Sequence, residues 1–340
     1  MKVLDAHTHL SGSGAHENTE GIVHCLEACE VDKAFVFAPL VDVHSWQLVD
    51  EHLNDIRAHN DYCADICSGA PDRLLAFCVL NPAPGLGNGS LDVAVDLMIE
   101  EAKRCYHDLG MRGVKMVPDG WYPYDPPVIR LYEALADLGM YVAFHSGIFL
   151  DGHAGRFCRP VFYEAVHQVP ELRAQLAHLS WPWVDECIAT LGMETIFYGN
   201  DTSKWQLKAD LSFGPPDDWQ LKSWELALDS LPHTMFFYAS DVFWPCTPER
   251  YREQFLQPQL GLFEVAATNG HIAEEGSGKR AKMREEIFFD NCYAHWQAAV
   301  REPQQPRAAK QPVLTPRARA HTHDKPKRRP IAQQRGESGS

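Results

Sequence analysis

Histidine and aspartate residues stand at the ends of four short apolar segments of this 340-residue chain. The first segment ends in His7 and His9, the next two in His145 and His178, and the last in Asp241. Side chains at positions i and i+2 of a strand share one face, so His7 and His9 can hold one metal ion together. An HxH pair alone is weak evidence, but its combination with the other strand-end residues predicts a metal site.

The segments that must position these residues alternate between strand-like and helical patterns. Apolar runs predict eight strands, at Lys2–His9, Lys33–Pro39, Leu74–Pro82, Met111–Pro118, Met140–Gly147, Leu172–Ser180, Thr195–Asn200 and Thr234–Asp241. Helical periods lie between them, such as Val128, Leu131, Tyr132, Leu135 and Leu138. This alternation predicts an α/β fold, a (β/α)8 TIM barrel, whose catalytic residues lie at the C-terminal ends of strands. A doubly wound open sheet is the alternative, although no glycine fingerprint follows the first strand.

Composition divides the chain into an acidic body and a basic tail. Residues 301–340 hold ten basic and three acidic side chains, a net charge of +7, and show no apolar period. We expect this Pro/Arg-rich segment to be disordered, and residues 1–300 to form one metal-dependent barrel domain. The body holds 21 basic and 43 acidic side chains, a net of −22, which argues against nucleic acid as a partner.

Cysteine usage and hydropathy indicate a cytoplasmic protein. The chain has ten cysteines but no CxxC motif, so we expect reduced core thiols rather than a disulfide framework or a thiolate zinc site. No apolar run is long enough to cross a membrane, and the first predicted strand at Lys2 leaves no room for a signal peptide. A homodimer is the default expectation for an enzyme of this size.

Several of these motifs together resemble those of the amidohydrolase superfamily. They are Asp5-Ala6-His7-Thr8-His9, Gly113-Val114-Lys115, Phe144-His145-Ser146-Gly147, Ala177-His178-Leu179, Ser240-Asp241 and Ile287-Phe288-Phe289-Asp290-Asn291. The branch they resemble is amidohydrolase family 2, which includes aminocarboxymuconate semialdehyde decarboxylase, resorcylate decarboxylases and some lactone hydrolases. The resemblance extends over roughly residues 2–296. It is specific for the superfamily but not for one reaction.

The resemblance implies a ligand set and catalytic roles for the strand-end residues. One divalent metal would be held by His7, His9, His145 and Asp241, with zinc favoured for nitrogen and oxygen ligands and manganese as the alternative. Asp241 would double as ligand and proton acceptor for a metal-activated water. His178 would lie near the open coordination position and hydrogen-bond the substrate oxygen, stabilising a developing oxyanion.

A lysine on the fourth predicted strand has two interpretations. In binuclear relatives a lysine on this strand is carboxylated and bridges two metals. The branch matched here is mononuclear, so we expect Lys115 to contact a substrate carboxylate or to pack its stem.

The loops that follow the predicted strands are rich in tryptophan and arginine. We predict an aromatic-walled pocket with an arginine clamp for a small carboxylate, built from Arg156, Arg159, Trp181, Trp183 and Trp244 together with Lys115. The alternative is that the tryptophans pack the loops and the arginines pair with surface acids. The segment from Asp201 to Ser230 is either a lid or an oligomer contact.

Four functions remain open from the sequence. The leading hypothesis is a metal-dependent hydrolase of a small amide, ester or lactone. The alternative is a non-oxidative decarboxylase of a small unsaturated or aromatic carboxylate. A hydratase is a third option, and a non-catalytic metal-binding barrel is the fourth. In each enzymatic case the partner is a small molecule, expected to carry a carboxylate.

Overall fold

The computed structural model describes residues 1–12, 17–40, 52–149, 152–212, 216–270, 274 and 276–300. The predicted basic tail, residues 301–340, lies outside the described residues. No helix of the described part is long and apolar enough to span a membrane. All ten cysteines are free thiols, and nine of them are buried.

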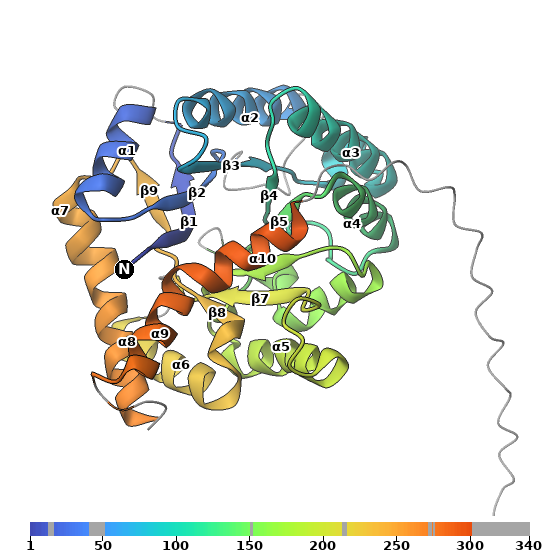
Figure 1. The fold of residues 1–340 in the computed structure, drawn as a ribbon. Helices are drawn as coiled ribbons and strands as arrows, with labels where there is room; N and C mark the ends of the chain where they lie inside the picture. The colour runs from blue at the N-terminus through green and yellow to red at the C-terminus, as the bar shows by residue number, and fades with distance from the viewer. Residues whose placement is uncertain are drawn as a thin grey trace, which may run out of the picture. The chain divides into compact units, whose positions relative to one another are not determined.

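Parallel strands form one curled sheet, as predicted for a TIM barrel (Figure 1). In chain order they are β1 (Leu4–Leu10), β2 (Lys33–Phe37), β3 (Leu74–Val79), β4 (Gly113–Met116), β5 (Tyr141–Phe144), β6 (Ala174–Leu176), β7 (Leu207–Asp210), β8 (Phe236–Phe237) and β9 (Val242–Trp244). Neighbours pair in the order β8-β7-β6-β5-β4-β3-β2-β1-β9. The Ala6 amide donates to the Tyr238 carbonyl (3.3 Å) and the Asp241 amide to the His7 carbonyl (2.8 Å). These bonds join β1 to the chain that follows β8.

Helices lie between most of the successive strands and around the outside of the sheet, and the last four follow the final strand (Figure 1). They are α1 (Thr19–Ala28), α2 (Leu53–Ser68), α3 (Leu91–His107), α4 (Pro126–Leu138), α5 (Val184–Tyr198), α6 (Asp217–Ser230), α7 (Pro248–Tyr251), α8 (Gln257–Asn269), α9 (Gly278–Glu285) and α10 (Asn291–Ala299). Helix α4 shows why the sequence pattern works. Two prolines open its first turn, Gly139 ends it at φ 71°, and its predicted apolar stripe is buried at Val128, Leu131, Tyr132 and Leu135.

The predicted seventh strand, Thr195–Asn200, is wrong. Its β-branched and aromatic residues lie at the end of α5, where Ile196 and Phe197 are 73% and 58% exposed. The seventh strand is instead β7, Leu207–Asp210, whose alternating Lys208 and Asp210 hide the apolar signal of a buried strand. Side-chain preference alone misplaced this element, because helix and sheet assignments depend on tertiary packing as well.

The last helix, α10, closes the end of the barrel at which the strands begin. His295 of α10 contacts the carbonyl of Ala174 through Nε2 (3.2 Å) and lies edge-on against Tyr141, and these two residues open β6 and β5. Figure 1 shows α10 crossing the barrel axis. Cys292 and Ala299 pack with the inward residues of the first strands in a second core. The opposite end, where the strands finish, is the one that carries the site.

Candidate metal centre

Strand β1 and the turn after β8 bring three ligand atoms to one point. Nε2 of His7 and Nε2 of His9 lie 3.0 Å apart. Oδ1 of Asp241 lies 3.2 Å from the first and 3.3 Å from the second. The two imidazoles are buried, whereas Asp241 keeps 26% of its side-chain surface exposed. Two imidazole nitrogens and one carboxylate oxygen form a donor set that suits a divalent transition metal.

The backbone at Asp241 is strained to achieve this approach. Its φ is +62°, in the left-handed region, which side-chain-bearing residues seldom adopt. The carboxylate of Asp5 accepts hydrogen bonds from the amides of Ser240 (2.9 Å) and His7 (3.2 Å). Tyr251 donates to the other oxygen of the Asp5 carboxylate (2.6 Å). This buried network holds the turn against β1.

The charge states of the three residues favour cation binding. Burial, followed by the nearby charge of Lys115, lowers the pKa of His7 to about 3. Burial also lowers the pKa of His9. Burial opposes ionisation of Asp241, but His7, His178 and His9 together lower its pKa below the usual value. Neutral imidazoles beside an ionised carboxylate are the forms that bind a metal ion.

Asp210, at the end of β7, fixes the orientation of His7. Its Oδ2 lies 3.1 Å from Nδ1 of His7 and also accepts a hydrogen bond from Nε2 of Gln175 (2.9 Å). A carboxylate oxygen can only accept here, so Nδ1 of His7 carries the hydrogen and Nε2 keeps its lone pair for a metal. Sequence reasoning missed Asp210 because it misplaced the seventh strand. A strand-end aspartate was the signal that could have revealed it.

His145 lies beside the three converging residues, one position after β5. Its ring centroid is 5.2 Å from that of His178, which in turn is 5.1 Å from that of His7. Nε2 of His145 contacts the carbonyl of Ile148 (3.0 Å), and a carbonyl can only accept, so Nδ1 keeps a lone pair. Burial holds the pKa of His145 well below its usual value. Its role as a fourth ligand stays a prediction, with Nδ1 as the atom concerned.

His178 occupies a left-handed turn directly after β6. Three consecutive residues have positive φ: His178 (61°), Leu179 (47°) and Ser180 (57°). The His178 amide donates to Oδ1 of Asp210 (2.9 Å), and Ser146 donates to the Ser180 hydroxyl (2.7 Å). Such strain is unusual outside functional sites and is held here by hydrogen bonds from neighbouring strands.

Lys115 reaches the same cluster from β4. Its side chain is 1% exposed, and Nζ lies 3.2 Å from Nε2 of His7 and 4.9 Å from the ring centre of Phe37. Burial lowers the pKa of Lys115 to about 8, partly offset by the charges of Asp241 and Asp210. The structure therefore brings the amine to the proposed metal ligands, and its expected contact with a substrate carboxylate stays a prediction.

The two arginines of the predicted clamp, Arg156 and Arg159, contact other residues of the protein. Arg159 pairs with Glu186 at the surface, and its guanidinium lies over the ring of Trp183 (5.1 Å). Nε of Arg156 donates to the carbonyl of His153 (3.2 Å). These contacts correspond to the alternative in which the arginines serve the surface. Binding of a substrate by either arginine is a prediction.

Two of the predicted wall tryptophans also make packing contacts. Trp244 is 1% exposed, donates to the Thr8 hydroxyl (3.0 Å) and stacks on Tyr251. Trp181 packs edge-on against Trp219, with centroids 6.3 Å apart. An aromatic residue that the sequence analysis overlooked is Phe243, which is 52% exposed and stacks on His9 (4.7 Å, 13°). Phe243 thus presents an aromatic face beside the three converging ligand atoms.

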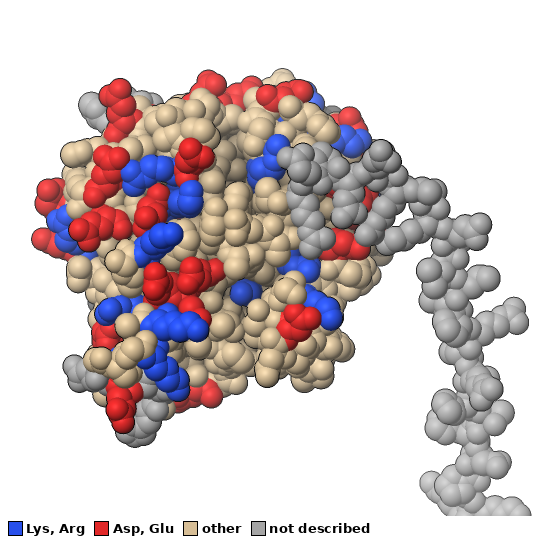
Figure 2. All heavy atoms as spheres, in the orientation of Figure 1, with Lys and Arg blue, Asp and Glu red and all other residues tan. Residues whose placement is uncertain are grey.

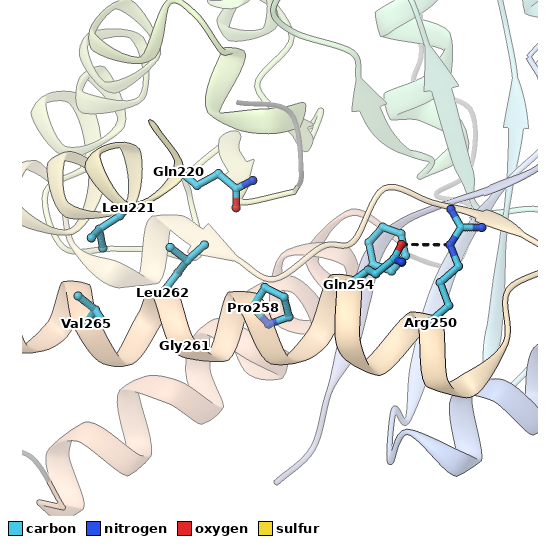
Figure 3. A pocket seen from close by; sticks show the side chains of 9 residues that line it. Gln220, Leu221, Arg250, Gln254, Pro258, Gly261, Leu262 and Val265 are labelled. Carbon is cyan, nitrogen blue, oxygen red and sulfur yellow. Dashed lines mark hydrogen bonds between the residues drawn. The ribbon is translucent and has the colours of Figure 1, made fainter. Parts of the chain in front are cut away.

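A groove of about 780 Å³ lies apart from these residues, between α6 and the helical segment around α8 (Figure 3). Its lining includes Leu221, Leu262 and Val265, and at one end Nε of Arg250 donates to Gln254 (3.2 Å). Gln220 lines this groove and also a small pocket against His178 and Ser212. Figure 2 shows basic and acidic side chains interspersed on the face it displays, without a basic stripe.

The family model described as "Amidohydrolase" matches residues 5–294. No curated protein sequence matches the chain.

Three solved structures illustrate the similarity in fold. The 5-carboxyvanillate decarboxylase of Sphingomonas paucimobilis has 11% identity and a TM-score of 0.56, over 87% of this chain and 99% of that one. A dihydroxybenzoic acid decarboxylase of Polaromonas sp. JS666, with bound manganese and 2-nitroresorcinol, has 13% identity and a TM-score of 0.57. The match covers 87% of this chain and 97% of that one. A probable 2-pyrone-4,6-dicarboxylic acid hydrolase of Acinetobacter baumannii has 12% identity and a TM-score of 0.51. The match covers 87% of this chain and 100% of that one. At such identities the similarity establishes the fold alone.

Proposed function

Because the chain belongs to the amidohydrolase family, we propose that it is a metal-dependent decarboxylase that releases CO2 from a small aromatic carboxylate. The observation that carries this proposal is the exposed ring of Phe243, stacked on His9 at the candidate metal centre. An exposed aromatic face at this position favours an aromatic substrate ring through offset stacking. Structures similar in fold include decarboxylases of 5-carboxyvanillate and of dihydroxybenzoates, which supports the same substrate class.

The metal would be held by His7, His9 and Asp241, with His145 as the proposed fourth ligand. When bound, a divalent ion supplies a Lewis acid that orients the substrate's oxygen atoms and withdraws charge from them. Manganese and zinc both accept this donor set, and manganese is bound in the similar dihydroxybenzoic acid decarboxylase. Asp210 contributes by holding His7 through Nδ1, so that the ligand needs no reorientation.

Asp241 is the proposed proton carrier. Its carboxylate is partly exposed, takes up a proton from a hydroxyl group or water, and delivers it to the ring carbon that bears the carboxylate. The ring's π electrons form the new C–H bond. The C–C bond then breaks, its electron pair restores the aromatic ring, and CO2 leaves. Protons and electrons balance without a redox partner.

Hydrolysis of a lactone, ester or amide, the leading hypothesis from the sequence, becomes the second candidate. The similar probable 2-pyrone-4,6-dicarboxylic acid hydrolase supports it. In this reaction Asp241 would take a proton from water as the oxygen attacks the carbonyl carbon. The same ligand set would serve both reactions, so the substrate decides between them.

The two candidates predict different products. Purified metal-loaded protein is incubated with hydroxylated aromatic carboxylates in D2O, and CO2 and ring deuterium are measured. We expect CO2 release, with one deuteron incorporated at the carbon that carried the carboxylate. The double variant His7→Ala/His9→Ala should lose this activity, and the control variant His107→Ala, at an exposed position, should keep it. Cleavage of a lactone or ester panel with 18O from water and no CO2 from any carboxylate would replace the proposal with the hydrolase.

A further inference from the structure

The Asp210 carboxylate receives five hydrogen bonds in the barrel interior. Oδ2 accepts from Nδ1 of His7 and from Gln175. Oδ1 accepts from the amide of His178 (2.9 Å), the amide of Ser212 (3.1 Å) and the Ser212 hydroxyl. The two backbone N–H groups and the Gln175 NH2 group can only donate, so both oxygens act as acceptors, the pattern of an ionised carboxylate.

This arrangement determines where the hydroxyl proton of Ser212 points. Ser212 has one hydroxyl proton and contacts two groups, Oδ1 of Asp210 and Nδ1 of His178 (2.7 Å). The carboxylate has no proton to give, so the hydroxyl must donate to Asp210. Its oxygen can then only accept from the His178 ring, which requires a hydrogen on Nδ1 of His178.

We propose that Ser212 is a positioning residue that fixes His178 in the tautomer with hydrogen on Nδ1 and a lone pair on Nε2. The relay runs from Asp210 through the Ser212 hydroxyl to the imidazole ring. Among the residues that the structure describes, Nε2 of His178 has no hydrogen-bond partner. His178 is 9% exposed as a whole residue, and Nε2 is the ring nitrogen left for a ligand.

One carboxylate thereby controls both the ring and the backbone of His178. Oδ1 of Asp210 binds the His178 amide directly and the ring through Ser212. The left-handed φ of His178 and the tautomer therefore depend on the same anchor. Leu211 and Trp224 line a pocket of about 10 Å³ beside Ser212 and His178, which has room for about one water molecule.

The tautomer changes the role of His178, on the basis of the function proposed above. The resemblance of the sequence motifs to the amidohydrolase superfamily predicts that His178 donates a hydrogen bond to a substrate oxygen. A neutral His178 with hydrogen on Nδ1 instead accepts at Nε2. Nε2 then accepts a hydrogen bond from one hydrogen of a water molecule, whose other hydrogen is the proton that Asp241 takes up.

The test reads the tautomer itself and does not depend on turnover. Histidine labelled with 15N is incorporated into the full chain, loaded with diamagnetic zinc, and two-bond 1H–15N spectra are recorded. His178→Gln identifies the His178 signals by difference. The same spectra of Ser212→Ala, which removes the hydroxyl, and Ser212→Thr, which keeps it, complete the set. Circular dichroism and zinc content confirm that each variant is folded and loaded.

We expect a protonated Nδ1 and an unprotonated Nε2 in the wild type and in Ser212→Thr, and loss of this single pattern in Ser212→Ala. A proton on Nε2 in the wild type, or an unchanged pattern in Ser212→Ala, overturns the proposal. Ser212→Ala should lower kcat about tenfold with little change in KM, and Ser212→Thr should restore it. If no carboxylate is turned over, the proposed function fails while the tautomer result still stands by itself.

Discussion

Nδ1 of His7 lies 3.1 Å from Oδ2 of Asp210, on the opposite side of the imidazole ring from His9 and Asp241. A residue that contacts no proposed metal position thus sets the orientation of a proposed ligand. Such outer carboxylates fix the tautomer and the ring orientation of a ligating histidine.

Asp210→Asn should weaken metal binding by about 10–100-fold. An asparagine amide turned with its oxygen toward His7 points its NH2 group at the amides of His178 and Ser212, which also donate. In the opposite orientation the NH2 group faces Nδ1 of His7, which must then accept a hydrogen bond and cannot carry the hydrogen. Competition with a chelator measures the affinity, with the exposed-site variant Asp185→Asn as control. Equal affinities in both variants would contradict the orienting role.

Lys115→Met tests whether the site holds one metal or two. The ammonium group lies 3.2 Å from a proposed ligand atom and repels a cation. We expect the variant to keep one metal per chain and to bind it about tenfold more tightly, because a like charge is removed. Elemental analysis and chelator competition report both quantities. A wild type with two metals per chain, both lost in Lys115→Met, would instead indicate a carboxylated lysine bridge.

Asp241→Asn should separate proton transfer from metal binding. Asparagine keeps one oxygen near His7 and His9 but cannot carry the proton. We expect the rate of CO2 release to fall by about 10²–10⁴-fold while part of the metal content is retained. Asp229→Asn, on the exposed side of α6, serves as the control for a lost carboxylate. Full activity in Asp241→Asn would remove Asp241 from the mechanism.

Gly147→Ala should disturb the site through the backbone. Gly147 has φ +118°, and an added Cβ would lie 2.3 Å from the carbonyl oxygen of Trp181, which forces the loops after β5 and β6 apart. We expect a loss of about 3 kcal/mol in the free energy of unfolding, together with reduced activity. Gly152→Ala is the matched control, because Gly152 also has positive φ (+71°) but no atom within 4 Å of the added Cβ. Denaturant titration measures the free energy of unfolding of both variants. A loss in Gly147→Ala alone indicates that the close approach of the Cβ causes it, and equal losses indicate that the positive φ does.

Lys208→Met should stabilise the protein at neutral pH. Burial lowers the pKa of Lys208 from 10.5 to about 8. Within the described residues Nζ makes one long hydrogen bond, to the Asn291 carbonyl (3.5 Å), and lies 5.9 Å from the ring centre of Trp205. Between pH 8 and 10.5 the unfolded chain keeps a proton that the folded chain has released, so wild-type stability rises with pH in this window. The full rise is roughly 3 kcal/mol.

Lys208→Met has no amine to titrate, so its free energy of unfolding should not rise with pH in this window. At pH 7 its free energy of unfolding should exceed that of the wild type by up to roughly 3 kcal/mol. The measurement is the difference in unfolding free energy between wild type and Lys208→Met at a series of pH values. Lys282→Met, at a 75%-exposed lysine, is the control and should show no such trend. A difference independent of pH would mean that the buried amine does not titrate in this range.

The sequence revealed the barrel and the residues at its centre more readily than the walls around them. His7 and His9 share a strand face, so their convergence follows from local geometry, and the structure shows it. Asp241 could be placed because an apolar run leads to it. Asp210 could not be placed, because Lys208 interrupts the apolar pattern of β7. The residues at the end of α5 match the pattern of a buried strand better than β7 does.

The walls of the site depend on loop conformation, which residue spacing does not encode. Arg159 precedes a short 3-10 helix and turns toward Glu186, an ion pair between segments 27 residues apart. Phe243 reaches His9 because β9 pairs with β1 in parallel, with Phe243 opposite His9. A single amino-acid sequence offers no local sign of that pairing.

The position of α10 has a consequence for synthesis on the ribosome. Leu4 and Ala6 of the first strand share their core with Phe289, Cys292 and Ala299, near the end of the described chain. Because the chain emerges N-terminus first, β1 is made early but finds its last packing partners only when α10 has left the exit tunnel. Until then the apolar surface that α10 covers stays exposed, which is the condition under which nascent chains aggregate.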